Sequence, residues 1–127
     1  MAVSTFFLVH IIERFSRLQP VTYRRIFNGY GVYHLGAQFA ILLNDQVYFR
    51  ADEESWFFYE EHAFTPFSSH VMDDLPCNFY LVPAESIVDI DSLEYWMLIA
   101  LESTHRSCGV AASDGWLAAT RQHLKLG

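Results

Sequence analysis

The chain has 127 residues, and its 15 acidic against 8 basic side chains give a formal net charge of −7. This length predicts a single domain over residues 1–127, large enough to bury a core without a metal or a disulfide. The hydrophobic fraction of 52% excludes an intrinsically disordered chain, and composition alone leaves the function open.

The first fifty residues pass from a helical pattern to a strand pattern. Ser4 or Thr5 can cap a helix that ends at Gln19-Pro20. Its apolar side chains recur at helical spacing: Phe7, Leu8, Ile11, Ile12, Phe15 and Leu18. Strands are expected at 30–33, 39–43 and 47–50, separated by Gly36 and by Asn44-Asp45. This predicts a three-stranded antiparallel meander.

The middle of the chain predicts a second helix and two more strands. Asp52 is expected to open the helix, with Glu53 and Glu54 in its first turn, where the helix dipole favours negative charge. Its large side chains are Trp56, Phe57 and Tyr59. Strands are expected at 67–72 and 78–82, each flanked by proline.

The third helix has the clearest pattern. Asp91 with Glu94 resembles a capping box, and Gly109 is expected to end the helix. Its apolar stripe consists of Leu93, Trp96, Met97, Ala100 and Leu101. A short last helix is expected from Ser113, with Trp116, Thr120 and Leu124 on one side. The order α-β-β-β-α-β-β-α plus a tail helix predicts an α+β two-layer sandwich, with helices packed against one antiparallel sheet.

Two uncharged stretches could suggest a membrane or export segment. Residues 1–12 lack a basic region before them and a cleavage signal after them. Residues 26–44 approach membrane-spanning length but contain several glycines and polar side chains, which favours strands around a turn. We therefore expect no membrane anchor. Two cysteines are too few for a disulfide scaffold, so a cytoplasmic protein is expected.

Residues 20–105 resemble a known family. The run from Tyr23 to Tyr33 (YRRIFNGYGVY) is similar to the F-G-G-Y-G-hydrophobic-Y signature of the TfoX/Sxy N-terminal domain, with Asn28 where the family usually has glycine. The signature residues matched are Phe27, Gly29, Tyr30, Gly31, Gly36, Phe39, Tyr48, Tyr80 and Pro83. The family resembles the type III secretion chaperones in topology, which agrees with the order of elements above.

The resemblance implies regulation of natural competence. TfoX/Sxy proteins act with the cyclic-AMP receptor protein to switch on DNA-uptake genes. Full-length members carry a second, helical domain, whereas about 22 residues follow the matched region here. We therefore expect a stand-alone N-terminal domain that is a non-enzymatic regulator and contacts a protein partner. The alternative is a small-molecule-binding or enzymatic domain that uses a cleft between sheet and helices.

The glycines of the signature have a structural interpretation. Gly29 and Gly31 flank Tyr30 in a strand, so both leave room for another backbone or an aromatic ring. Gly36 is expected in a hairpin turn with φ above zero. No phosphate-binding loop is predicted, because Gly-Tyr-Gly does not lead into a helix.

Catalytic and metal-binding candidates are few. Cys77 and His70 could pair as nucleophile and base, with Asp73 or Asp74 orienting the histidine, but an inert thiol is the favoured interpretation. The possible metal ligands His62, His70, His105 and Cys108 show no ligand spacing. We therefore expect no catalytic residue, no metal and no cofactor.

Charge is distributed unevenly and identifies two possible partner surfaces. Residues 31–105 contain one arginine, Arg50, against 13 acidic side chains, so tight direct DNA binding by this chain alone is not expected. The basic candidates are Arg14, Arg17, Arg24 and Arg25. The acidic candidates are Glu53, Glu54, Glu60 and Glu61, beside Asp52 on the second predicted helix.

The aromatic content predicts self-association. The chain has 11 Phe, 7 Tyr and 3 Trp residues, more than one small core needs. Phe57, Phe58 and Tyr59 are consecutive on a predicted helix, so they cannot all face one side. Large apolar surface left exposed marks an interface, and we expect a homodimer.

Overall fold

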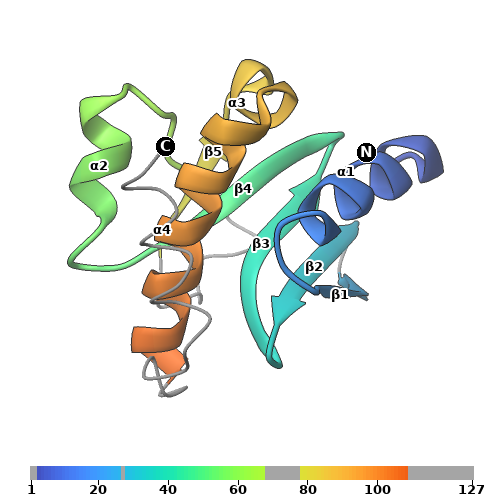
Figure 1. Cartoon of the computed structure of the whole chain (residues 1–127), viewed down its shortest axis with the longest axis horizontal. Helices are drawn as coiled ribbons and strands as arrows, with labels where there is room; N and C mark the ends of the chain where they lie inside the picture. Colours follow the sequence, from blue (N-terminus) through green and yellow to red (C-terminus); the bar gives the residue numbers. More distant parts are fainter. Residues whose placement is uncertain (1–2, 27, 68–77, 109–127) are drawn as a thin grey trace.

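The computed structural model describes residues 3–26, 28–67 and 78–108. A five-stranded antiparallel sheet has the strand order β1-β2-β3-β4-β5. Its elements are α1 (Thr5–Ser16), β1 (Thr22–Ile26), β2 (Gly29–His34), β3 (Ala37–Leu43), β4 (Gln46–Ala51), α2 (Trp56–Glu61), β5 (Asn78–Val82), α3 (Ala84–Val88) and α4 (Ile90–Cys108). Figure 1 shows α1 and α4 in front of the sheet, so the predicted α+β sandwich is confirmed.

The core lies between the sheet and the two long helices. From α1, Ile11 and Phe15 are almost fully buried, because they lie on the helical stripe that faces the sheet. The Phe15 ring centroid lies 5.6 Å from that of Phe39 on β3 and 5.8 Å from that of Phe49 on β4. From α4, Leu93 and Met97 belong to the same cluster. Such aromatic pairs add about 0.5–1.5 kcal/mol beyond the area that they bury.

Two tight turns form the meander. Leu35 and Gly36 have φ values of 53° and 80°, and they join β2 to β3 across the pair His34 and Ala37. Asn44 and Asp45, at 55° and 56°, join β3 to β4. Positive φ at both central residues matches the right-handed twist of the flanking strands. The expected position of Gly36 in a turn with φ above zero is confirmed.

Gly36→Val should lower the free energy of unfolding by about 1–3 kcal/mol. The added Cβ would meet nothing within 4 Å, so the loss comes from backbone strain rather than from a steric clash. Gly36→Asn is the control, because asparagine adopts the left-handed conformation at lower cost. Urea unfolding of the three proteins measures the difference, and an unchanged midpoint for the valine variant would contradict it.

The strand β1 and the helix α3 were not predicted. Residues Thr22–Ile26 have adjacent arginines at their centre and are exposed on almost every side chain, so no apolar alternation marks them as a strand. Helix α3 has only five residues and follows Pro83, which serves as its N-cap residue. Such a short helix has no periodicity that a sequence pattern can reveal.

The predicted starts of two helices are wrong. Helix α2 begins at Trp56 after Ser55, because the carbonyl of Asp52 accepts hydrogen bonds from the backbone N–H of both Ser55 and Trp56. Asp52, Glu53 and Glu54 therefore form a turn before the helix. Helix α4 begins at Ile90, so Asp91 lies in its first turn and not at the cap, and the predicted capping box is absent.

The later elements are partly tested. Residues 78–82 form β5, and α4 ends at Cys108, next to the predicted stop at Gly109. Most of the predicted strand 67–72 and the predicted tail helix from Ser113 lie outside the described residues. Residues 65–67 run beside β5, where the N–H of Phe67 donates to the carbonyl of Phe79 and the N–H of Leu81 to that of Thr65.

Candidate functional site

Four of the residues that the sequence suggested lie outside the described part of the chain: Cys77, His70, Asp73 and Asp74. His62 is exposed at the end of α2, with its ring 5.0 Å from that of Trp96, whereas His105 is buried. Within the described ranges, no group of three His, Cys, Asp or Glu side chains could hold a metal ion.

A small pocket lies between the residues that follow α1 and the helix α4. It is lined by Leu18, Gln19, Glu94, Met97, Leu98 and Leu101. Its volume of about 10 Å³ has room for about one water molecule. It is therefore too small for a metabolite, which needs several hundred Å³.

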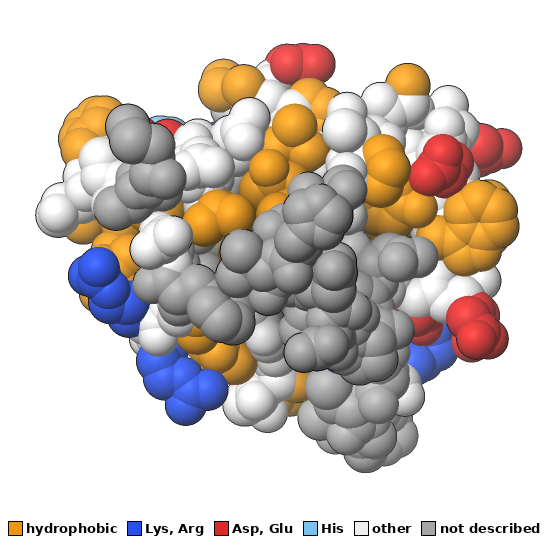
Figure 2. All heavy atoms as spheres, turned by 180° about the vertical axis from the view of Figure 1, so that it is seen from behind, with side chains coloured by type: hydrophobic (Ala, Val, Ile, Leu, Met, Phe, Trp, Pro, Cys, Tyr) orange, Lys and Arg blue, Asp and Glu red, His pale blue; other side chains and the backbone are white. Residues whose placement is uncertain are grey.

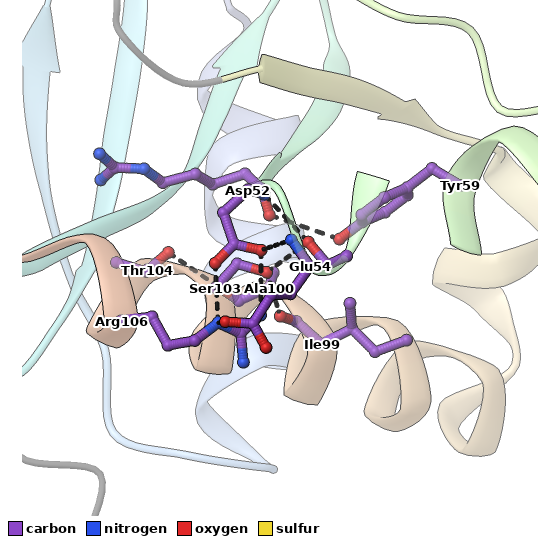
Figure 3. Close-up of polar contacts among 10 residues, drawn as sticks. Asp52, Glu54, Tyr59, Ile99, Ala100, Ser103, Thr104 and Arg106 are labelled. Carbon is purple, nitrogen blue, oxygen red and sulfur yellow. Dashed lines mark hydrogen bonds and ion pairs between the residues drawn. The ribbon is translucent and has the colours of Figure 1, made fainter. Parts of the chain in front are cut away.

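A polar cluster joins the turn before α2 to the last part of α4 (Figure 3). The Arg106 guanidinium holds Asp52 with two hydrogen bonds, from Nε to Oδ2 at 2.7 Å and from Nη2 to Oδ1 at 3.0 Å. Burial alone would raise the pKa of Asp52, but the hydrogen bonds and the charge of Arg106, with a further hydrogen bond from the Glu54 backbone N–H, outweigh it and lower that pKa. Glu54 adds a second carboxylate 3.4 Å from Arg106 Nε.

Two buried serines extend the cluster into the protein. Ser103 Oγ donates to the carbonyl of Ile99 at 2.8 Å and lies 2.6 Å from Ser55 Oγ. Because the Ser103 proton is used in this way, Ser55 is the donor of the serine–serine bond. Ser55 Oγ in turn accepts from the backbone N–H of Asp52 at 3.0 Å. This chain of bonds fixes the turn, and with it the start of α2, against α4.

Tyr59 fixes the rest of α2. Its side chain is fully buried, and its ring stacks on that of Tyr80 with centroids 4.9 Å apart and planes 4° apart. The rings of Phe64 and Trp96 pack around it. Burial raises the pKa of Tyr59 far above its ordinary value.

With one side anchored, α2 presents an aromatic and acidic surface. Trp56 and Phe57 are 46% and 40% exposed, whereas Phe58 is half-buried and Tyr59 is buried. The expectation that Phe57, Phe58 and Tyr59 do not all face one side is therefore confirmed. Glu60 and Glu61 are exposed on the same helix. Glu60 also accepts a hydrogen bond from Tyr80 Oη at 2.9 Å, and burial together with this bond raises the pKa of Tyr80 to about 12.

The four candidate arginines do not act as one group. Arg14 donates hydrogen bonds to the carbonyl oxygens of Ile87 and Val88 at 2.7 and 2.6 Å. It therefore caps the C-terminal end of α3, where carbonyl groups lack partners within the helix. Arg17 pairs with Glu13 on α1. Arg24 and Arg25 lie on β1. In Figure 2, with β1 toward the left and α2 toward the right, basic side chains gather at the left margin and acidic ones mainly at the right and top.

The glycines of the family signature admit close neighbours. A Cβ on Gly29 would overlap the backbone carbonyl oxygen of Leu42 on β3. A Cβ on Gly31 would lie 2.8 Å from Tyr33 Oη and 2.9 Å from Gln38 Nε2. One glycine therefore makes room for a backbone and the other for an aromatic side chain.

The other signature residues are spread over the sheet and its turns. Phe39 and Tyr80 are core residues, Tyr30 packs against the core, and Pro83 precedes α3. Tyr48 lies against Phe67, with ring centroids 4.9 Å apart. Phe27 lies outside the described residues.

A buried histidine pair was missed by the sequence interpretation. His34 at the end of β2 and His105 on α4 are 3% and 1% exposed, and His34 Nδ1 lies 3.0 Å from His105 Nε2. Burial and the neighbouring His105 lower the pKa of His34 to about 4. The only sequence signal was a histidine in an otherwise apolar run, and the two residues are 71 positions apart.

Comparisons place these features in a family. Among the described residues, no helix combines the length and the apolar character needed to cross a membrane. No curated protein matches the chain significantly. The family model of the TfoX N-terminal domain matches residues 13–104, which include the glycine signature, the meander and most of α4. The chain therefore belongs to the TfoX N-terminal domain family.

Proposed function

We propose that this chain is a cytoplasmic, non-enzymatic regulator of competence for DNA transformation, and that it contacts a DNA-bound transcription activator of the cyclic-AMP receptor type. The observation that carries the proposal is the family match over residues 13–104. The net charge of −7 supports contact with the activator rather than with the duplex, because duplex affinity comes from many cationic contacts to phosphate.

Two surfaces are suited to such a contact. One is the aromatic and acidic outer side of α2, with Trp56, Phe57 and Glu61. The other is the exposed strand β1, with Arg24 and Arg25. Charged surfaces of this kind set the orientation and the rate of association more than the final affinity.

A mobility-shift titration on competence-type promoter DNA tests the proposal. The chain alone should give no tight shift, whereas a supershift should appear when the receptor protein and cyclic AMP are present. A tight, salt-sensitive shift by the chain alone would overturn the proposal. Glu61→Lys and Arg25→Glu probe the two surfaces, and Glu85→Lys on α3 is the control for a charge change elsewhere.

The proposal includes a homodimer. Phe6 and Val9 are 82% and 62% exposed and lie one turn apart on α1, so they form apolar surface that a second copy can cover. Light scattering at tens of micromolar should give about twice the chain mass of 14.7 kDa. A monomer mass there would count against the dimer, and Phe6→Glu should shift a dimer toward that mass.

A further inference from the structure

The two edges of the sheet differ. At one edge, β5 is covered by the chain itself, because residues 65–67 pair with it through two backbone hydrogen bonds and the bridge between Pro66 and Tyr80. At the other edge, β1 pairs only with β2 among the described residues (Figure 1). The outer side of an edge strand presents unpaired N–H and C=O groups at alternate residues, which are a template for another strand.

The side chains of β1 surround this edge with positive charge. Four of its five residues are exposed and Ile26 is half-buried. Tyr23 and Arg25 point to one face of the sheet and Arg24 to the other, because side chains alternate along a strand. The Arg24 guanidinium carbon lies 5.0 Å from the Tyr33 ring centroid, and Nη2 donates to Tyr33 Oη at 3.2 Å. An added strand would therefore meet a guanidinium on each face.

This chemistry selects among possible occupants. Two arginines are too few to hold a nucleic acid on a chain with a net charge of −7. Antiparallel pairing of β1 with β1 of a second copy would bring four arginines onto strands about 4.8 Å apart, and like charges on adjacent strands are destabilising. An extended segment with carboxylates on adjacent residues, whose side chains point to opposite faces, has the matching backbone and the matching charge.

We propose that β1 is the docking edge for an extended acidic segment of a protein partner, which adds to the sheet as a sixth strand. The identity of that partner as a transcription activator rests on the proposed function, whereas the binding chemistry does not. Main-chain hydrogen bonds would supply affinity, and the pairs of Arg24 and Arg25 with carboxylates would supply specificity. The competing interpretation is that the arginines only protect an edge strand from aggregation.

A peptide titration tests the edge directly. The probe is a nine-residue peptide in which pairs of adjacent glutamates are separated by single valines, so that carboxylates point to both faces of the strand. One matched peptide has lysine in place of glutamate, and another has N-methyl groups on alternate amides. With the whole chain labelled for NMR, the glutamate peptide should shift the backbone amides of Thr22–Ile26 and those of β2 beside them. The lysine and N-methylated peptides should bind at least tenfold more weakly.

Variants of the chain distinguish binding at β1 from a general effect of net charge on peptide binding. Arg25→Glu should weaken binding of the glutamate peptide at least tenfold. Arg17→Glu makes the same charge change just after α1 and should weaken binding less than threefold. Arg24→Glu is a second edge variant, and circular dichroism checks that each protein is folded. Equal losses for Arg17→Glu and Arg25→Glu would overturn the proposal, as would binding elsewhere or no binding at millimolar peptide.

The identity of the partner and the docking at β1 are tested by separate outcomes. If the acidic segment belongs to the receptor protein, the glutamate peptide should compete away the supershift described above. A supershift that survives saturating peptide would overturn that assignment, and a missing supershift with the wild-type chain would count against the proposed function alone. If Arg25→Glu dissociates a dimer, a second copy of the chain occupies β1. That result would overturn the proposal that an acidic segment docks there.

Discussion

Gly29→Ala is expected to lower the free energy of unfolding by about 3 kcal/mol or more, because the added methyl group meets backbone atoms. The new Cβ would overlap the carbonyl oxygen of Leu42 on the neighbouring strand, with the carbonyl carbon 3.2 Å away. These are backbone atoms of β3, which is held by β2 on one side and β4 on the other. Relief of the overlap therefore requires movement of a strand.

Gly31→Ala is the matched control, two residues further along the same strand. Its Cβ would meet Tyr33 Oη at 2.8 Å and Gln38 Nε2 at 2.9 Å, and both atoms are the far ends of flexible side chains. They can move aside, and alanine also restricts the unfolded chain, which offsets part of the loss. The expected cost is about 1 kcal/mol or less.

Urea unfolding followed by circular dichroism compares the two alanine variants. The difference between them should be at least about 2 kcal/mol, which is larger than the usual error of the extrapolation. If the Gly29→Ala protein does not fold and the Gly31→Ala protein does, the ranking of their stabilities is the one expected. Equal stabilities would contradict the close approach of the two strands.

The parts of the fold that local chemistry dictates could be predicted from the sequence. Gly36 and the Asn44-Asp45 pair are residue types that tolerate positive φ, so both hairpin turns were found. The core stripe of α4 was found because Leu93, Met97 and Leu101 recur at helical spacing and are buried.

Other features depend on partners distant in sequence. Strand β1 is polar and has no hydrophobic pattern that would predict a strand. It is extended because it pairs with β2 along its whole length. The start of α2 was misplaced because Asp52 favours a helix cap as strongly as it favours a turn. Here Arg106, 54 positions later, holds its carboxylate, and Ser55 becomes the N-cap residue of α2. The contact between His34 and His105 likewise exists only after β2 and α4 pack together.

That histidine pair makes the stability of the protein depend on pH. Burial and the neighbouring His105 hold the pKa of His34 at about 4 in the folded protein, against an ordinary value of 6.5. Below pH 6.5 the unfolded chain binds a proton at this histidine that the folded chain does not. Stability from this group is therefore full above pH 6.5 and is lost as the pH falls toward 4.

We expect the free energy of unfolding to fall by up to about 2 kcal/mol between pH 6.5 and pH 5 through His34, since one pH unit in this window corresponds to about 1.4 kcal/mol. Urea unfolding at several pH values measures the slope. His34→Gln should flatten it, and His10→Gln, which changes an exposed histidine of α1, is the control for the loss of a histidine. The pKa of Asp52 lies below its ordinary value of 3.8, so loss of its contribution falls at lower pH and does not mask the effect. Identical slopes for the wild-type and His34→Gln proteins would show that His34 takes up its proton in the folded state as readily as in the unfolded chain.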